Sequence, residues 1–174
     1  MRVHIMVDLE TLGLNSNAVI VSAGLVAFDR DTFKELGTLE VGFDLNQQIK
    51  TGGTIDGDTI EFHFKQEYYS IQKMANREVL PVKDAIDKIN AFVNEHKAEA
   101  LWGNGATFDN VILRNLYTRF LRVFPLPFWA DRDLRTAVDI GNIDTREIPF
   151  TGIKHYSLDD ALHQVKILKA AIKK

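Results

Sequence analysis

Three short acidic motifs lie far apart in this 174-residue chain. They are Asp8-Leu9-Glu10 near the start, Phe108-Asp109 in the middle and His155-Tyr-Ser-Leu-Asp159-Asp160 near the end. Carboxylates that are held close together repel one another, so each tends to remain protonated. Divalent cations bind such oxygen ligands and relieve the repulsion, and two bound cations can catalyse cleavage of a phosphodiester. Together, the motifs could form one metal site.

Asp8 and Glu10 close a predicted β-strand. Apolar side chains alternate with others over residues 3–10, and side chains two positions apart on a strand point to the same face. Both carboxylates therefore point the same way, and a turn containing Gly13 and Asn15 follows at once. Ligands often bind beyond the carboxyl ends of strands in such sheets. A solvated strand end explains the pair equally well when it is taken alone.

Asp109 lies at the start of a predicted helix, after the turn Trp102-Gly-Asn-Gly. The helix dipole favours an acid in the first turn, and for Asp109 alone this is the simpler explanation. Phe108, the preceding residue, fits either a packing role or a surface on which a base could stack.

His155 and Asp160 flank the predicted start of the last helix. Ser157 can cap this helix, with Asp160 in a capping-box-like position and Asp159 in the same first turn. His155 then lies before the cap, where the loop can bring its imidazole near Asp160. A histidine there could act as general base for a water molecule, because its pKa lies near neutrality. The other histidines show no ligand spacing and are expected to be structural or surface residues: His4, His63, His96 and His163.

Hydrophobic periodicity predicts the elements that must position these side chains. Strands are expected at 3–10, 19–28, 36–43 and 98–102, the first three as an antiparallel meander. Helices are expected as a broken segment at 59–74, from Pro81 onward, over 108–120, near 134–140 and over 158–172. Residues 46–58 and 122–133 are expected to be loops. This order predicts an α/β (α+β) domain with helices packed on a mixed sheet.

The composition suits one globular domain, expected to span residues 1–174, because 45% of the residues are hydrophobic. A net charge of −3 excludes a generally basic nucleic-acid coat, yet an enzyme that grips only a strand end needs few phosphate contacts. The chain contains no cysteine, which excludes disulfides and zinc–thiolate sites and agrees with the cytoplasm. Neither a secretory signal nor a membrane span is expected from its apolar runs.

The order and context of the motifs are more specific than each motif alone. The sequence resembles the DEDDh branch of the DnaQ-like 3′–5′ exonuclease superfamily over nearly its whole length, in the phage and prophage RNase T-like form (exodeoxyribonuclease VIII-like or 3′ exoribonuclease). The matching segments are Val7-Asp8-Leu9-Glu10-Thr11-Leu12-Gly13, Trp102-Gly-Asn-Gly-Ala-Thr-Phe-Asp109-Asn-Val-Ile-Leu113, Arg132-Asp133-Leu134-Arg135-Thr136 and His155-Tyr-Ser-Leu-Asp-Asp160-Ala161. The resemblance implies an RNase H-like fold with a mixed five-stranded sheet and helices on both faces.

The resemblance also implies a site for two Mg²⁺ or Mn²⁺ ions. The four ligands would be Asp8, Glu10, Asp109 and Asp160. One ion would be held mainly by Asp8, Glu10 and Asp160. The second would be held by Asp8, with Asp109 acting through water.

The resemblance gives His155 the role of taking the proton from the attacking water. A related branch has a tyrosine four residues before the final aspartate, and Tyr156 stands at that position. The His-x4-Asp spacing and the sequence Leu158-Asp159-Asp160-Ala161 fit the histidine branch better.

A member of this branch would release nucleoside 5′-monophosphates from the 3′ end of a nucleic acid, with single-stranded DNA favoured and RNA close behind. The expected substrate-binding residues are Thr11, Leu12, Phe108, Arg132, Arg135 and Lys154. Leu12 and its neighbours would wedge against the terminal base, and the basic residues would contact phosphates, although ordinary surface charge explains each of them singly. RNase T-like proteins usually carry an aromatic pair within residues 59–66, where this chain has His63 between two phenylalanines. Related enzymes can be dimers, so a homodimer is a further expectation.

Two other functions fit the same fold. A non-catalytic module that binds nucleic acid or protein is one, but such a module has no physical reason to keep mutually repelling acids. An endonuclease of the RNase H-like class is the other, and a circular substrate would test it.

Overall fold

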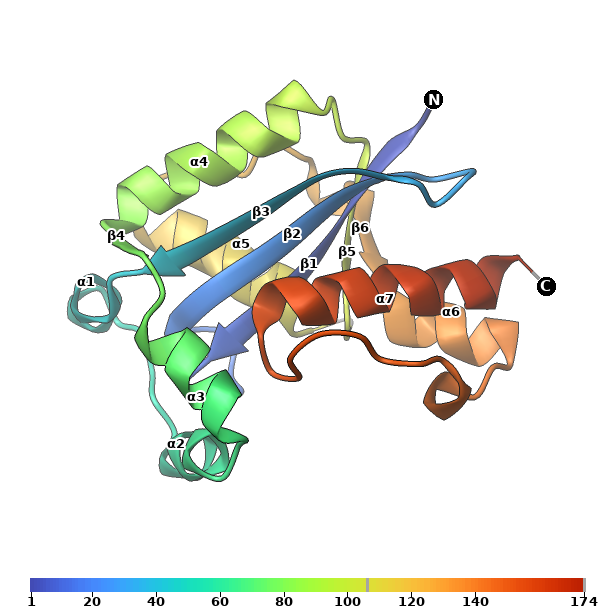
Figure 1. Ribbon diagram of the computed structural model, residues 1–174. Coiled ribbons are helices and arrows are strands. Elements are labelled where there is room, and N and C mark those ends of the chain that lie inside the picture. Colours follow the sequence, from blue (N-terminus) through green and yellow to red (C-terminus); the bar gives the residue numbers. More distant parts are fainter. Residues whose placement is uncertain (106, 174) are drawn as a thin grey trace.

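A mixed β-sheet forms the centre of the molecule (Figure 1). The computed structural model describes residues 1–105 and 107–173, and only the backbone of Tyr69, so that Ala106 of the second motif lies outside it. Within these residues the strand order is β4-β3-β2-β1-β5-β6. The strands are β1 Val3–Thr11, β2 Ile20–Asp29, β3 Glu35–Phe43, β4 Val79–Leu80, β5 Ala100–Gly103 and β6 Asp131–Asp133. β1, β2 and β3 are antiparallel neighbours, and the other pairings are parallel.

The expected mixed sheet and its initial meander are confirmed, but the described residues form six strands rather than five. The edge strands β4 and β6 contain only two and three residues. Segments this short carry no alternating pattern, and they are strands only because they pair with β3 and β5. The prediction of a loop over 122–133 was therefore wrong at residues 131–133.

The helices are α1 Leu45–Lys50, α2 Gly57–Phe64, α3 Tyr68–Ala75, α4 Val82–Glu95, α5 Asp109–Arg119, α6 Leu134–Gly141 and α7 Ser157–Ile172. The expected helices are present, and the broken segment is the pair α2 and α3. The predicted loop at 46–58 was wrong over α1 and at residues 57 and 58, where α2 begins. The side chain of Gln48 on α1 is buried and bonds to the backbone N–H and C=O of Ile20, so a polar residue anchors this helix to β2.

Helices cover both faces of the sheet (Figure 1). The side chains of Val3, Ile5, Val7 and Leu9 on β1 belong to a core with residues of α4 and α5. Met6 belongs to the opposite core, together with residues of α6 and α7. Asp8 and Glu10 share the face of Met6 because strand side chains alternate. Both carboxylates therefore lie on the face of the sheet that α7 covers.

Ser157, predicted to be the N-cap of α7, is not the cap in the structure. Tyr156 is the N-cap residue, and Ser157 is the first residue of the helix. The side chain of Ser157 is completely buried, and its Oγ lies 3.2 Å from Oγ of Ser22 on β2. Ser157 is unavailable as a cap because the first turn of α7 packs directly on the sheet.

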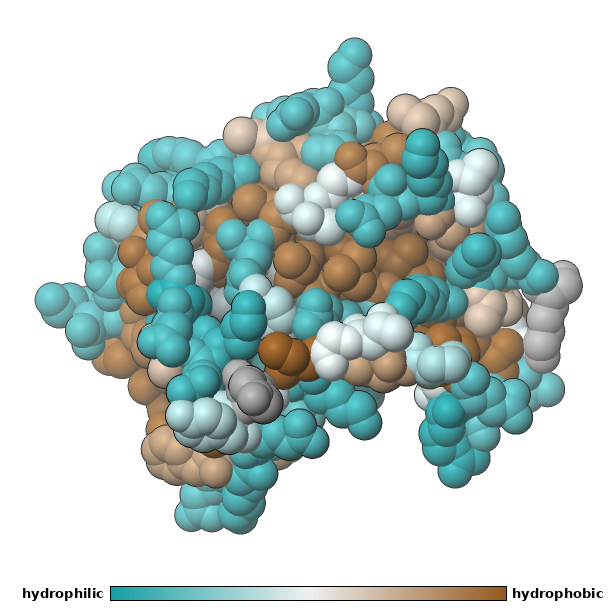
Figure 2. Space-filling model, viewed as in Figure 1, coloured by the Kyte–Doolittle hydropathy of each residue, from teal (hydrophilic) through white to brown (hydrophobic). Residues whose placement is uncertain are grey.

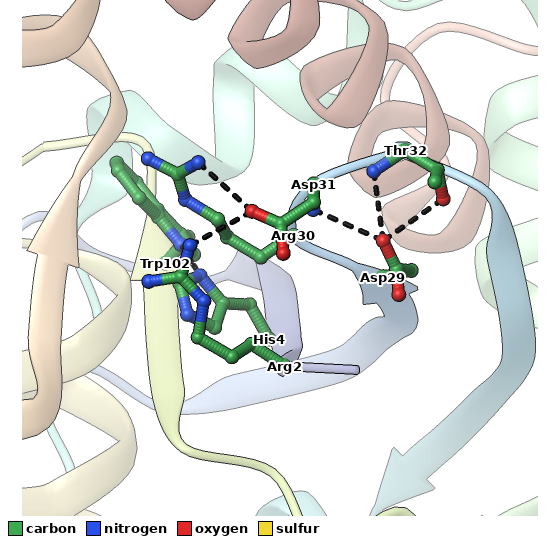
Figure 3. Close-up of polar contacts among 7 residues, drawn as sticks. All are labelled: Arg2, His4, Asp29, Arg30, Asp31, Thr32 and Trp102. Atoms are coloured by element: carbon green, nitrogen blue, oxygen red, sulfur yellow. Dashed lines mark hydrogen bonds and ion pairs between the residues drawn. The ribbon is translucent and has the colours of Figure 1, made fainter.

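Hydrophilic residues cover most of the surface visible in Figure 2, and hydrophobic residues show mainly between α4 and α7. Polar contacts also secure the opposite end of the sheet from Asp8 and Glu10 (Figure 3). There, Asp29 accepts hydrogen bonds from the backbone and hydroxyl of Thr32, and Arg2 pairs with Asp31. These contacts hold the β2–β3 turn against the start of β1. Among the described helices, none is long and apolar enough to span a membrane.

Candidate metal centre and active site

The C-terminal half of β1 lies beside the start of α7 (Figure 1). This half of the strand carries Asp8 and Glu10. Asp8 lies opposite Gly24 of β2 in the sheet register, and Glu10 lies opposite Ser22. Glu10 is buried, with 8% of its surface exposed. Asp8 and Glu10 therefore point to the same face of the sheet, as expected, because they lie two positions apart on a regular strand.

Gly24 allows α7 to approach this part of the sheet. A Cβ atom at this position would overlap the backbone of Ser157 and Leu158 at the start of α7. The close approach brings Asp160, in the first turn of α7, to Glu10. Potential ligand atoms of Glu10, His155 and Asp160 all lie within 4.8 Å of one another. This trio differs from the expected combination of Asp8, Glu10 and Asp160.

Asp109 enters from the helix that follows the neighbouring strand. It is the first residue of α5, and residues 104–108 connect this helix to β5, which lies parallel to β1. Its Oδ1 accepts the backbone N–H of Leu9 at 3.1 Å, and its Oδ2 accepts the backbone N–H of Asn104 at 2.8 Å. Asp109 is buried, with 2% of the residue exposed, and the two backbone N–H groups hold its carboxylate in one orientation.

Gln164 also belongs to the site, although no motif in the sequence predicted it. It lies one helical turn after Asp160 on α7, and its Nε2 donates to Oδ1 of Asp8 at 2.6 Å. The other side-chain atom, Oε1, is buried and has no hydrogen-bond partner among the described residues. The spacing of four residues from Asp160 was the available signal, because such residues share one face of a helix.

The electrostatics of the four acids suit a cation site. Burial, followed by the charges of Asp109, Glu10 and Asp160, raises the pKa of Asp8 well above its usual value. Burial and the neighbouring acids Asp160 and Asp109 raise the pKa of Glu10 to about 8. Burial likewise raises the pKa of Asp109 and of Asp160 to about 6 each. Clustered hard oxygen donors of this kind fit Mg²⁺ or Mn²⁺, whose charge offsets the repulsion.

His155 faces the same acids from a constrained loop. Its backbone has a φ of 59°, which is uncommon for a residue with a side chain. The ring edge of Phe62 packs against the imidazole, with 5.1 Å between centroids. Burial and the nearby His63 and Lys154 lower the pKa of His155, which favours the neutral form that can accept a proton. Tyr156, the alternative candidate, instead donates its hydroxyl to Glu40 of β3.

Three of the four acids, together with His155 and Gln164, border a cleft of about 470 Å³, called the active-site cleft below. Its lining residues are Asp8, Leu9, Glu10, Thr11, Leu14, Asp58, Thr59, Phe62, His63, Asn104, Phe108, His155, Asp160 and Gln164. Thr11 and Phe108 are thus placed where substrate contact is expected. Leu14, which is 71% exposed, lines the cleft in place of the expected Leu12. The backbone of Leu12 instead bonds to Val19 and Asp56.

The two arginines that were expected to bind substrate, Arg132 and Arg135, do not line the active-site cleft. Arg135 lies beside Gly105, and its charge lowers the pKa of Asp109. Arg132 donates to the backbone carbonyls of Trp129 and Asp131, and neither arginine is among the residues that line the active-site cleft. His63, expected to be structural, donates from Nε2 to the carbonyl of Thr11 at 2.7 Å and also lines the cleft. Its place on α2 could not be foreseen from histidine spacing.

The fold and the acids gathered with a histidine are those of a DnaQ-like 3′–5′ exonuclease with an RNase H-like fold. The chain belongs to the family of the 3′–5′ exoribonuclease Rv2179c-like domain, whose family model matches residues 3–172. It is therefore a 3′–5′ exonuclease, a hydrolase. The chain is 26% identical over 201 residues to an exodeoxyribonuclease of Enterobacteria phage T4, which covers 97% of this chain and 88% of that protein.

Solved structures show the same fold. A complex of E. coli exonuclease I with single-stranded DNA has a TM-score of 0.67 at 13% identity, covering 100% of this chain. This chain spans only 42% of that exonuclease I chain. The nuclease domain of 3′hExo, a DEDDh family member bound to rAMP, has a TM-score of 0.61 at 13% identity, covering 95% of this chain and 88% of that one.

Proposed function

We propose that the domain formed by residues 1–174 uses two divalent cations, Mg²⁺ or Mn²⁺, to remove nucleoside 5′-monophosphates from the 3′ end of single-stranded DNA. The observation that carries this proposal is the convergence of Asp8, Glu10, Asp109, His155 and Asp160 from three distant segments. No single segment supplies enough oxygen ligands, so the site depends on the tertiary structure. The likeness to the phage T4 exodeoxyribonuclease supports DNA, whereas the exoribonuclease description of the family supports RNA, which is the alternative substrate.

Each side chain then has a distinct task. Asp8, Glu10, Asp109 and Asp160 would hold the cations. When bound, the cations lower the pKa of an attacking water and stabilise the charge on the leaving 3′ oxygen. His155, neutral near pH 7, would accept the proton of that water, and Gln164 would keep the carboxylate of Asp8 in one orientation.

The active-site cleft also provides surfaces for the terminal nucleoside. Phe62, Phe108 and Leu14 offer apolar contacts on which a base could pack. Thr11 lines the same cleft, and its Oγ1 already donates to the carbonyl of Gly13 at 2.7 Å. The cleft would thus hold one nucleoside next to the cations.

The direct test uses matched DNA and RNA oligonucleotides labelled at either end, with Mg²⁺ or with EDTA. A 3′ label should appear first as a mononucleotide, and a 5′ label should shift down a ladder one nucleotide at a time, only with the metal. Asp8→Ala should abolish hydrolysis and keep the fold, while Asp139→Ala, on exposed α6 surface, should remain active. Full activity of Asp8→Ala, or cleavage of a circular strand, would reject the proposal.

A homodimer, expected from the resemblance, is part of the proposal and is tested by light scattering of the purified protein. Leu121, Val123, Phe128 and Trp129 are exposed apolar side chains available for such contact. A constant monomer mass over the working concentration range would remove this part and leave the catalytic proposal intact.

A further inference from the structure

The loop that precedes α7 carries His155 in an uncommon backbone conformation. Its φ of 59° lies in the left-handed region, where the Cβ atom of an ordinary residue crowds the following carbonyl oxygen. A residue stays in such a conformation only where surrounding contacts hold it. The imidazole of His155 therefore depends on the residues before and after it for its place beside the acids.

Two hydrogen bonds hold the backbone that leads to His155. Oδ2 of Asp159 accepts the backbone N–H of Ile153 at 2.7 Å, which ties the loop to the first turn of α7. Oγ of Ser70, a buried residue of α3, donates to the carbonyl of Lys154 at 2.7 Å. None of the described residues of α3 lines the active-site cleft, so Ser70 influences the site through this loop.

Tyr156 holds the loop on the other side of His155. Its side chain lines a separate cleft of about 410 Å³, whose walls include residues of α3 and β3. The hydroxyl donates to the carboxylate of Glu40 on β3, and the ammonium group of Lys73 on α3 lies 4.9 Å from the centre of the ring. A hydrogen bond to a carboxylate is stronger than one between neutral groups. Tyr156 is thus a firm anchor that does not line the active-site cleft.

The register of the sheet links this anchor to the candidate metal centre. Asp8 on β1 lies opposite Gly24 on β2, and Gly24 lies opposite Glu40 on β3. Directly opposite residues of antiparallel strands share a face, so one row across the sheet carries a candidate metal ligand at one end and the partner of Tyr156 at the other. The anchor therefore has a fixed position relative to Asp8.

We propose that the hydroxyl of Tyr156, held by Glu40, positions His155 for catalysis. This inference rests on the proposed function, in which His155 accepts the proton of the attacking water. A base must lie within hydrogen-bond reach of that proton, and a small displacement costs much of the rate. Tyr156 is a positioning residue, because it acts through His155 and does not touch the substrate. Ser70 supports the same loop from α3.

Tyr156→Phe removes the hydroxyl and keeps the ring over which Lys73 lies. It should lower kcat for an oligo(dT) strand roughly 10- to 100-fold, the cost of slightly misplacing a catalytic group, and leave KM nearly unchanged. Glu40→Ala should have the same effect, and Glu40→Gln, which keeps an acceptor oxygen, should restore most of kcat. Glu35→Ala, on exposed β3 surface, removes an equal charge and should have no effect.

A second background separates positioning of His155 from an effect on the acids. In His155→Ala there is no imidazole to position, so the addition of Tyr156→Phe should lower kcat no further. The affinity for Mn²⁺, measured by calorimetric titration, should be the same in Tyr156→Phe and in the unmodified protein, because all four acids remain.

NMR spectra of the histidine rings give a readout that needs no turnover. The ring signals of His155 should shift or broaden in Tyr156→Phe and in Ser70→Ala. The signals of His96, at the end of α4, should stay the same. Ser70→Ala and Glu40→Ala leave α7 unmodified, so they carry the test if Tyr156→Phe fails to fold.

Unchanged kcat in both Tyr156→Phe and Glu40→Ala would overturn the inference. An equal fall of kcat in the two backgrounds would also overturn it, because Tyr156 would then act on the acids. An active unmodified enzyme whose His155 signals do not change in Tyr156→Phe would refute the inference alone. An unmodified protein that hydrolyses no strand would refute the proposed function, and this inference with it.

Discussion

Gln164 donates a hydrogen bond from Nε2 to Oδ1 of Asp8 at 2.6 Å, although 156 positions separate the two residues. The bond links α7 to β1 directly beside the acid cluster. It occupies one carboxylate oxygen and fixes the plane of the group, so that the other oxygen keeps a defined direction. A partner that orients a metal ligand in this way contributes to affinity without touching the metal.

Gln164→Leu should lower the affinity for Mn²⁺ or the kcat/KM by roughly 10- to 100-fold, the usual effect of losing such a partner. In the metal-free protein, Gln164→Glu should lower the stability more than Gln164→Leu does, because it adds a like charge next to Asp8. Calorimetric Mn²⁺ titration measures the affinity, and a thermal melt verifies folding. Gln72→Leu on exposed α3 surface is the control. An affinity unchanged in Gln164→Leu would show that Asp8 needs no such support.

Gly24→Ala should destabilise the protein and weaken metal binding together. The added Cβ would overlap the backbone of Ser157, and overpacking of a core costs about 1–3 kcal/mol. Because α7 must move away from β2, Asp160 would also move away from Glu10. Gly57→Ala, where a Cβ meets no atom within 4 Å, should be neutral. Urea unfolding with and without Mn²⁺ compares the two variants, and equal stabilities would contradict the packing argument.

His155→Ala should lower kcat by about 10²- to 10⁴-fold, the usual contribution of a general base. Mn²⁺ should still raise the melting temperature of this variant, because the acids remain. A ligand role for His155, whose nitrogen lies near Glu10 and Asp160, gives a different result. In that case, the Mn²⁺-dependent rise in melting temperature would fall along with turnover, and the general-base assignment would fail.

The metal-free protein should lose stability as pH rises from 6.5 to 8.5. The folded pKa of Glu10 is raised to about 8 from 4.5, so the folded state binds more protons than the unfolded state in this window. The free energy of unfolding therefore falls with pH. The raised pKa of Asp8 acts in the same direction. Three histidines have a lowered pKa, and they change the free energy of unfolding mainly below pH 6.5: His4, His155 and His163.

Thermal melts in EDTA at the two pH values measure this effect. Added Mn²⁺ should raise the melting temperature more at pH 8.5, because fewer protons compete for the acids. Glu10→Gln should flatten the dependence in EDTA. A melting temperature that is constant or rises with pH in EDTA would show that burial and the neighbouring acids do not raise the pKa of Glu10.

Local sequence patterns were sufficient to predict several elements of the fold and the class of enzyme. The alternation over residues 3–10 was sufficient to predict β1 and the common direction of Asp8 and Glu10, since side-chain direction on a strand depends only on position along it. Helical spacing predicted α7 in the same way. The class of enzyme also followed from the sequence, because the order and context of the three motifs are distinctive together.

Contacts between distant segments decided the rest. The strands β4 and β6 exist through pairing with β3 and β5, and α1 is anchored through Gln48, so none of them has a signal of its own. The roles of Gly24 and Gln164 appear only once α7 lies on β2 and β1. A sequence specifies which way a side chain points from its own element, but which neighbours it meets depends on how the elements pack.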